Sequence, residues 1–470
     1  MIEQRGLSAP QLRPTPDLST SPRAVWRLTW PQMLMMYLVF FMGFVAVWVA
    51  GQISAEVQAA LGMVNQCGIF LMVVAMAISS GATAAVSQSL GALKVARAQR
   101  YVATTVIGCF GLGFVMALLG WRFGDAILGM LMVPDSIMPV TKELWQVSML
   151  ALPAQYVYAA TGVMFRATRQ VIPPLWVAAV VCAANLLACL GFGLGWFGLP
   201  NWGYMGLAWA TVGAQCLGAV CNCALLAHSG YLQRRTLPTP RWLKAGLPYL
   251  VKVALPAGAA QIVWQSGYLT LFVLVASLPF DSVNALAGLT AGLRVEALLF
   301  LPGMAFNMSV AVLVGNSLGA GKPAEAKKVA LFMVGAAALA MSLMAALLWP
   351  FRQEIALMLS QEPGTQAQIV NYLTFNLLST PFSIASTVMG GVMTGAGATK
   401  YNLMIFGGTF WLVRLPLGWL LGHMLWGTAS GVFVAMLVSQ CLQTSIMLYV
   451  VLRRDWMRFA MSRIRQPHPA

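Results

Sequence analysis

Three ionisable side chains lie deep inside long apolar segments of the sequence: Arg294, Glu296 and Arg414. A charge at the centre of a lipid bilayer costs on the order of 3 kcal/mol on insertion scales, so each of these groups needs a partner or a water-filled cavity. Glu296 lies about 13 residues into its segment, which is about 20 Å along a helix and close to the middle of a hydrocarbon core about 30 Å thick.

Arg294 and Glu296 are two residues apart, which points helical side chains about 200° apart, so they cannot pair neatly with each other. Glu296 therefore has two interpretations. In one, it takes up and releases a proton as it is exposed to each side of a membrane in turn. In the other, it neutralises Arg414 or Arg294. The two can coexist, because a proton could break such a pair, and structural anchoring is the favoured role of both arginines.

Neutral polar groups in the apolar segments could line a cleft. Gln261, Gln265 and Tyr268 are spaced i, i+4 and i+7, so they share one face of a helix. Trp264 flanks that face, and a polar and aromatic stripe on an otherwise apolar helix suits a cleft wall. Such groups more often hydrogen-bond between helices than bind a ligand. The further intramembrane candidates are Gln66, Asn185 and Ser383.

The composition indicates which elements must position these groups. The chain has 470 residues, of which 59% are hydrophobic and 9% charged, whereas about 25% of the residues of a soluble domain are charged. The sequence therefore predicts an all-α polytopic membrane protein. All eight cysteines lie in apolar runs without the spacing of a metal site, so we expect free thiols, no metal site and no cofactor.

Runs of about 20 apolar residues, long enough to cross a bilayer as helices, recur along the chain. They predict twelve transmembrane helices, with residues 122–142 forming an interfacial loop because Asp125, Pro134 and Asp135 interrupt them. The expected spans are 28–50, 58–86, 101–121, 144–165, 172–195, 203–228, 247–277, 283–314, 327–350, 367–392, 401–422 and 427–452.

Basic residues outside the hydrocarbon core are unevenly distributed. We assign 23 of them to the N-terminal segment, the even-numbered loops and the C-terminal tail, and only Arg122, Lys142 and Arg352 to the opposite side. The positive-inside rule then predicts a multi-pass protein of the bacterial inner membrane with both termini cytoplasmic. The net charge of +16 is then a topology signal beside anionic lipid, and no basic groove with interleaved aromatic residues indicates nucleic-acid binding.

The two halves of the sequence are similar at an offset of about 228 residues. SQSLGALKVARAQR (Ser87–Arg100) parallels GNSLGAGKPAEAKK (Gly315–Lys328), and two shorter matches follow in the same order. Each half holds six expected spans, so both enter the membrane in the same direction, as two six-helix lobes related by a parallel repeat. The offset gives two matched pairs of polar positions, Gln66 with Arg294 and Asn185 with Arg414.

Two lobes of this kind enclose a central cleft and expose it to each side in turn as they rock, so the repeat favours a transporter. The predicted organisation has five parts. They are a cytoplasmic N-terminal segment (1–27), an N-lobe (28–228), a cytoplasmic linker (229–246), a C-lobe (247–452) and a basic cytoplasmic tail (453–470).

Several stretches resemble one known family, the multidrug and toxic compound extrusion (MATE) transporters. They are LGA with a basic continuation in each half, LRVEALLFLPGMAFNMSVAVLVGNSLGAGK (Leu293–Lys322), VMTGAGATK (Val392–Lys400) and LVRLPLGWLLG (Leu412–Gly422). The resemblance covers about 420 residues. It implies twelve helices in two lobes, and export of organic compounds by antiport with Na⁺ or H⁺.

The chain departs from the family where many members have acidic residues. Ala46 stands at the place of an Asp in the first helix, and Cys189 at the place of the Asp of an Asn-x-x-x-Asp motif that begins here with Asn185. Many members have a Glu early in the seventh helix, and the matching stretch here, Trp264–Ser266, has no acidic residue. Ser383 stands at the place of an Asp in the tenth helix. The usual acidic cation sites are thus missing, which leaves Glu296 as the coupling candidate and H⁺ or Na⁺ as the ion. Sodium is less favoured, because a hard cation needs several oxygen ligands.

We therefore expect a monomer in the lipid bilayer that exports small organic compounds and is not an enzyme. Two deep arginines against one glutamate predict tolerance of neutral or anionic amphipathic compounds. The alternative is a lipid-linked precursor flippase of the same superfamily shape, in which several arginines and lysines line the cleft. A channel or a membrane enzyme is a weaker alternative, since none of the three histidines lies near an acidic partner in the sequence.

Overall fold

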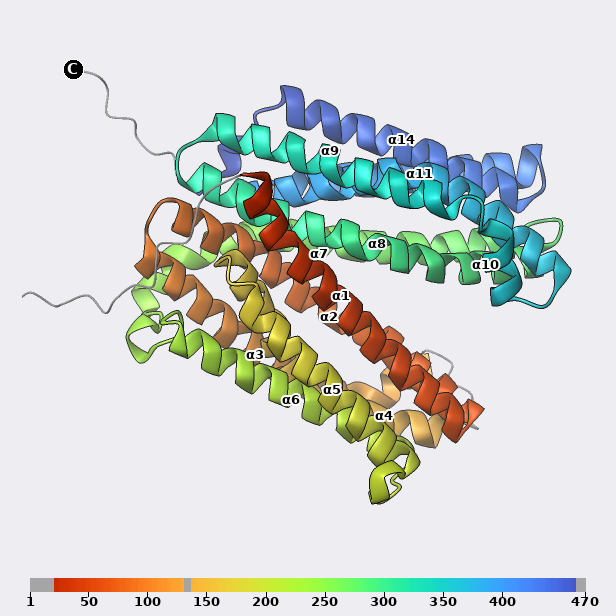
Figure 1. Ribbon diagram of the computed structural model, residues 1–470, viewed down its shortest axis with the longest axis horizontal. Coiled ribbons are helices and arrows are strands. Elements are labelled where there is room, and N and C mark those ends of the chain that lie inside the picture. Colours follow the sequence, from red (N-terminus) through yellow and green to blue (C-terminus); the bar gives the residue numbers. More distant parts are fainter. Residues whose placement is uncertain (1–20, 131–136, 462–470) are drawn as a thin grey trace, which may run out of the picture.

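The computed structural model describes residues 21–130 and 137–461, and within these ranges the chain is helical and contains no strand (Figure 1). Twelve helices of the described chain are long and apolar enough to cross a membrane, which confirms the predicted fold class. They are α1 (Pro22–Ile53), α2 (Ala55–Gly91), α3 (Val95–Met130), α4 (Met138–Ala167), α5 (Ile172–Leu194), α6 (Tyr204–His228), α7 (Pro240–Ala276), α8 (Ser282–Gly319), α9 (Pro323–Leu348), α11 (Pro363–Ala396), the run from α12 through η4 (Thr399–Leu425) and α14 (Ala429–Arg453).

Helices α1 and α7 begin well before their apolar segments. Ser21 caps α1 by accepting a hydrogen bond from the backbone N–H of Ala24 at 3.3 Å, and Thr239 caps α7 in the same way. A proline follows each cap, where its missing N–H costs nothing. Helix α1 therefore begins six residues before the predicted span, and α7 begins inside the segment predicted as a linker (229–246).

Helices α1 to α6 form an N-lobe, and α7 to α14 form a C-lobe. Figure 1 shows the two lobes close together at the end of the molecule where α1 begins, and drawing apart toward the other end. The hydrogen bonds between the lobes among the described residues all lie near the first end. One of them runs from the Gln32 side-chain amide of α1 to the Ser309 hydroxyl of α8, at 2.9 Å. We call this zone of contact the closed seam.

The closed seam explains the LGA motif of each half. A Cβ atom at Gly91 would collide with the backbone of Asn316, and one at Gly319 would collide with the backbone of Gln88. Because Gly319 and Asn316 are the repeat equivalents of Gly91 and Gln88 at the offset of 228, these two contacts are the same contact made twice. The missing side chains let α2 and α8 approach closely about the symmetry axis between the lobes.

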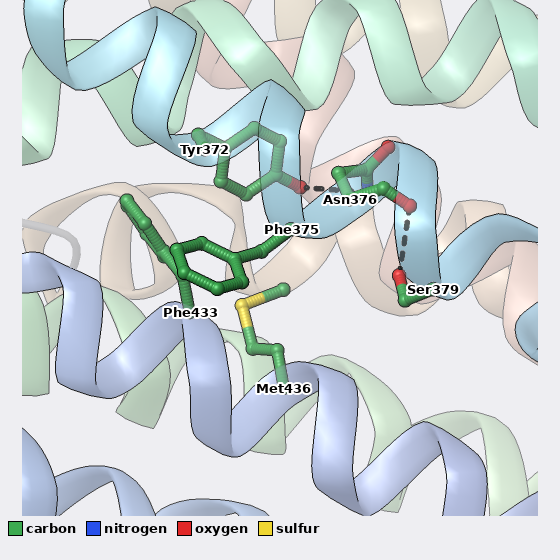
Figure 2. Close-up of a pocket in the computed structure, with 6 residues that line it drawn as sticks. All are labelled: Tyr372, Phe375, Asn376, Ser379, Phe433 and Met436. Atoms are coloured by element: carbon green, nitrogen blue, oxygen red, sulfur yellow. Dashed lines mark hydrogen bonds between the residues drawn. The ribbon is translucent and has the colours of Figure 1, made fainter. Parts of the chain in front are cut away.

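The C-lobe has its own apolar core between α8, α11 and α14. Tyr372 of α11 packs edge-to-face on Phe433 of α14, with ring centroids 5.2 Å apart, and both side chains are fully buried (Figure 2). Leu289 of α8 lies in the same cluster. This core fixes the positions of α8 and α11 relative to each other, and these helices carry the groups described below.

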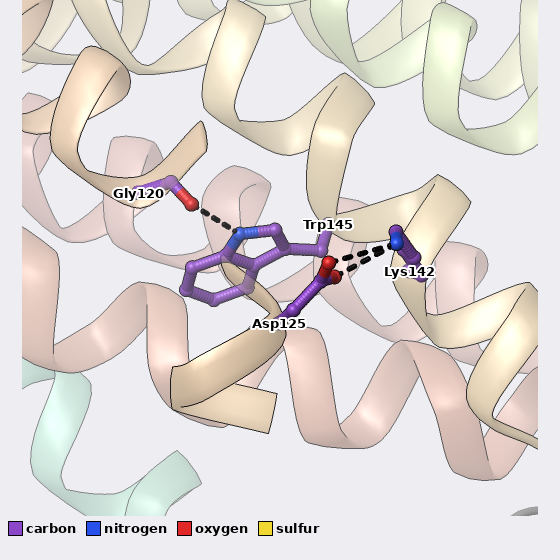
Figure 3. Close-up of polar contacts among 4 residues, drawn as sticks. All are labelled: Gly120, Asp125, Lys142 and Trp145. Carbon is purple, nitrogen blue, oxygen red and sulfur yellow. Dashed lines mark hydrogen bonds and ion pairs between the residues drawn. The ribbon is translucent and has the colours of Figure 1, made fainter. Parts of the chain in front are cut away.

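The end of α3 differs from the sequence prediction. Helix α3 continues through Met130, whereas residues 122–142 were expected to form an interfacial loop. Asp125 forms an ion pair with Lys142 of α4 at 2.9 Å, and the Trp145 indole N–H donates to the Gly120 carbonyl, also at 2.9 Å (Figure 3). Because α4 supplies these partners, a helix can carry the aspartate at the membrane edge. Pro134 and Asp135 lie outside the described residues.

Candidate ion-coupling site and inter-lobe cleft

Glu296 lies on the face of α8 that packs against α11. The Tyr372 hydroxyl donates a hydrogen bond to the Glu296 carboxylate. Asn376 lies one helical turn further along α11 and donates from Nδ2 to the Tyr372 oxygen at 3.4 Å (Figure 2). Glu296 is half-buried, whereas Tyr372 and Asn376 are buried. The Glu296 carboxylate is thus hydrogen-bonded inside the C-lobe by the Tyr372 hydroxyl, which itself accepts a hydrogen bond from the Asn376 amide.

A buried arginine, Arg414, is within electrostatic range of this carboxylate. Its side chain is only 1% exposed, and its positive charge acts on Glu296, although the two groups form no direct ion pair among the described residues. Nε donates to the Ser439 hydroxyl of α14 at 2.8 Å, and the guanidinium lies 4.5 Å above the Phe410 ring. Nη1 is buried without a hydrogen-bond partner in the described chain, so Arg414 keeps a donor free for a changed arrangement.

Arg414 owes its position to a widened stretch of helix. Residues Thr409–Arg414 form a π-helical turn directly before Pro416. A proline inside a helix lacks a donor and collides with the carbonyl four residues earlier, and a wider turn relieves that collision. The Thr409 hydroxyl contacts the Gln443 side chain of α14 at 2.9 Å, and Gln443 donates in turn to Ser386 of α11. These contacts anchor the wide turn against both neighbouring helices.

An aromatic cluster closes one side of the site. Trp264 and Tyr268 of α7 are in tilted contact at a centroid distance of 5.2 Å, and Phe410 lies 5.6 Å from the first ring and 5.4 Å from the second. Gly267 leaves room for this packing, because a Cβ atom there would meet the Phe410 ring. Tyr268 also lies within the electrostatic influence of Glu296 and Arg414. The predicted residues Trp264, Tyr268, Glu296 and Arg414 therefore lie in one neighbourhood of the C-lobe.

A small cavity adjoins the hydrogen-bonded end of this site. It has a volume of about 10 Å³ and is lined by Tyr372, Phe375, Asn376, Ser379, Phe433 and Met436 (Figure 2). This is the space of about one water molecule. The buried Oδ1 of Asn376 has no hydrogen-bond partner in the described chain, so a single water there would complete its hydrogen bonding.

The other predicted site residues lie elsewhere. Arg294 and Gln66 are exposed in the middle of their helices, whereas Asn185 is buried within the N-lobe, where it accepts from the Cys189 thiol at 3.7 Å. Ser383 is buried and donates to the Thr380 carbonyl of its own helix at 3.3 Å. The two remaining candidates, Gln261 and Gln265, are half-buried on α7. The two repeat-related pairs thus have matching environments, one pair exposed and one buried.

Sequence reasoning missed the closest neighbours of the two charges. Tyr372 donates a hydrogen bond to Glu296, and Asn376 donates one to Tyr372. Ser439 and Phe410 contact Arg414. The spacing i, i+4 of Tyr372 and Asn376 shows that they share a face of α11. Nothing in the sequence says that this face meets α8, because that depends on how three helices pack.

Comparison with known proteins places the whole chain in one group. The sequence model of the MatE family matches residues 31–190 and 256–420. The multidrug resistance protein PmpM of Pseudomonas aeruginosa is 26% identical over 389 residues, which cover 82% of this chain and 80% of that protein. Protein DETOXIFICATION 39 of Arabidopsis thaliana is also 26% identical, over 92% of this chain and 84% of its own.

Solved structures have the same fold. The Vibrio cholerae MATE transporter VcmN in its bent form superposes with a TM-score of 0.86 at 18% identity, over 93% of this chain and 97% of that one. An outward-facing multidrug resistance MATE family transporter of the MOP superfamily also gives 0.86, at 14% identity, over 96% and 100%. These relatives are transporters and not enzymes, and their names do not favour a lipid-linked precursor flippase. The protein is a multi-pass membrane transporter that belongs to the MatE family, the multidrug and toxic compound extrusion transporters.

Proposed function

We propose that this protein exports small organic compounds across the bacterial inner membrane by antiport with H⁺. The observation that carries the proposal is the position of Glu296. It is the only carboxylate in the middle of any membrane-spanning helix that the structure describes, it accepts a hydrogen bond from a phenol, and it is within the electrostatic influence of a buried arginine. A carboxylate at this depth is costly, and such groups in membranes commonly relay protons or bind ions.

Protonation of Glu296 would change the site in two ways. A neutral carboxyl no longer attracts Arg414, and it accepts only a weaker hydrogen bond from Tyr372 than the carboxylate does. Both changes loosen α8 from α11 and from the wide turn that carries Arg414. Loss of a partly desolvated pair can shift a two-state equilibrium by a few kcal/mol, which is enough to change which side of the transporter is open.

The surroundings favour a proton over sodium. Sodium binding would need several oxygen ligands around Glu296, and the available ones are the Tyr372 hydroxyl and the Asn376 side chain. The positive charge of the Arg414 guanidinium already acts on the carboxylate, and it would repel a sodium ion bound there. A proton needs no coordination shell, so it fits the site better.

The proposed topology indicates which side of the membrane is closed in this structure. The lobes touch through the closed seam, which lies at the end of the molecule where α1 begins. With both termini cytoplasmic, as the basic residues predict, the cytoplasmic side is closed and the lobes draw apart toward the periplasm. This is the state in which an exporter would release substrate and take up a proton.

The coupling ion can be tested in inverted membrane vesicles that contain the wild-type protein. A pH gradient with an acidic lumen, imposed without sodium, should drive accumulation of a transported dye. A sodium gradient imposed at equal pH should not. Accumulation driven by sodium alone would overturn the proton proposal, while leaving the protein an exporter.

A further inference from the structure

Arg294 has an unusual setting for a charge inside a membrane protein. It lies about 18 Å from the start of α8 at 1.5 Å per residue, and its side chain is exposed. The ion pairs of the described chain, Lys142 with Asp125 and Lys322 with Glu325, both lie elsewhere. Because a charge at this depth is costly in lipid, Arg294 must face water or a ligand.

The closed seam shows which way Arg294 points. Three residues of α8 meet the N-lobe there: Ser309 binds Gln32, Asn316 meets Gly91, and Gly319 meets Gln88. At about 100° per residue, Arg294 lies within about 60° of each of the three around the helix axis. It therefore lies on the side of α8 that faces the N-lobe, 15 residues or about 22 Å along the helix from Ser309 of the closed seam. Other exposed residues of α8 follow the same line, namely Val283, Ala287, Thr290 and Leu298.

Helix α2 of the N-lobe has the equivalent arrangement, with the neutral Gln66 in place of the charged Arg294. On α2, Ala77 meets Gly258 and Gly81 meets the Leu250 carbonyl of the C-lobe. Gln66 lies within about 60° of both around the axis of α2 and is also exposed. Gln66 and Arg294 thus lie at repeat-equivalent positions on the sides of α2 and α8 that face the other lobe. One wall presents a neutral amide and the other a guanidinium.

Glu296 does not cancel this charge. It lies about 200° from Arg294 around α8, where it binds Tyr372 and is within electrostatic range of Arg414. The acidic group of this region is therefore turned into the C-lobe, and Arg294 gives the side of α8 that faces the N-lobe an exposed positive charge. Apolar side chains lie beside the polar pair, with Phe70 and Leu298 each 41% exposed.

We infer that Arg294 and Gln66 form a recognition site for amphipathic organic anions, a substrate class that deepens the proposed export function and rests on it. A carboxylate, sulfonate or phosphate group would accept two parallel hydrogen bonds from the guanidinium of Arg294. The amide of Gln66 would bind a polar group on the opposite wall. The apolar body of the compound would lie against Phe70 and Leu298.

Three fluorescent compounds of nearly the same shape can test this inference. Dansylglycine is an anion, dansylglycinamide is neutral, and dansylethylenediamine is a cation at neutral pH. Fluorescence titration of the purified protein in detergent measures binding without any gradient. The wild type should bind dansylglycine at least tenfold more tightly than dansylethylenediamine. Arg294→Gln should abolish that preference while the affinity for dansylglycinamide stays unchanged, and Arg294→Lys should restore part of it.

The matched variant Arg352→Gln removes a guanidinium that donates to Thr374 at the outer end of the C-lobe, and it should retain the wild-type preference. If the wild type prefers the cation, binds none of the three compounds, or keeps its preference after Arg294→Gln, the inference is overturned. Because binding needs no gradient, this result is separate from coupling. An anion preference without transport driven by a pH gradient would support the inference and contradict the proposed function.

Discussion

Gln88 makes three hydrogen bonds in the closed seam, and their removal should shift the balance between the two open states. Its Nε2 donates to the Gly395 carbonyl of α11 at 2.8 Å. Its Oε1 accepts from the Tyr249 hydroxyl of α7 at 3.2 Å and from the backbone N–H of Met461 at 2.6 Å. Gln88 is 2% exposed, so one side chain of the N-lobe holds three segments of the C-lobe in a dry contact.

The size of the effect follows from these bonds. A hydrogen bond contributes about 1 kcal/mol net, so Gln88→Ala should weaken the closed seam by about 2–3 kcal/mol. The groups left without partners, such as the Gly395 carbonyl, regain hydrogen bonds to water only when the seam opens. At about 1.4 kcal/mol per factor of ten, the equilibrium between closed and open seam should shift by about 30- to 150-fold.

Distance measurements between spin labels can detect this shift. Leu93 and Lys322 are exposed residues just beyond α2 and α8, so cysteines there, in a background without the eight native cysteines, report the separation of the lobes at the seam. Gln88→Ala should add a population with a longer distance. The control Gln58→Ala removes the same side chain from the exposed, opposite end of α2 and should not change the distribution. A folded Gln88→Ala protein with the wild-type distribution would refute the reasoning.

Two further changes probe the site and the seam. Arg414→Met should lower the melting temperature in detergent, because it removes the positive charge that acts on the Glu296 carboxylate, a loss on the order of 1–3 kcal/mol. Adding Glu296→Gln should restore most of that loss. If the double variant instead loses the sum of the two single losses, the two charges do not act on each other. Gly319→Ala places a Cβ atom against the backbone of Gln88 and should lengthen the distance between labels at the seam, whereas Gly335→Ala on α9, where the added carbon meets no atom within 4 Å, should leave it unchanged.

Hydropathy and the internal repeat were sufficient to predict the architecture. The twelve apolar runs became twelve helices because backbone groups in lipid must be satisfied within each segment. The paired LGA motifs were found as part of the repeat, and the structure shows that Gly91 and Gly319 in them allow close helix contacts. The predictions failed at helix ends, as at Asp125, because a partner on another helix decides whether a polar residue can continue the helix.

The site was only partly predictable. Glu296, Arg294 and Arg414 could be found because a charge in an apolar run is conspicuous and must have a physical reason. Tyr372 could not, since a tyrosine in a membrane helix is common and its partner lies 76 residues away in the sequence. The separation of Arg294 from Glu296 followed from their spacing, but which of the two faces the cleft required the contacts between the lobes.

Proton-driven transport by the Glu296→Gln variant tests the central proposal most directly. The assay uses proteoliposomes with an acidic lumen and the neutral compound dansylglycinamide, so that substrate charge does not complicate the result. The wild type and the exposed control Glu354→Gln should accumulate the compound. Glu296→Gln should bind it with unchanged affinity and fail to accumulate it, and Glu296→Asp should retain part of the activity. Accumulation by Glu296→Gln at the wild-type rate would contradict the assignment of Glu296 as the coupling residue.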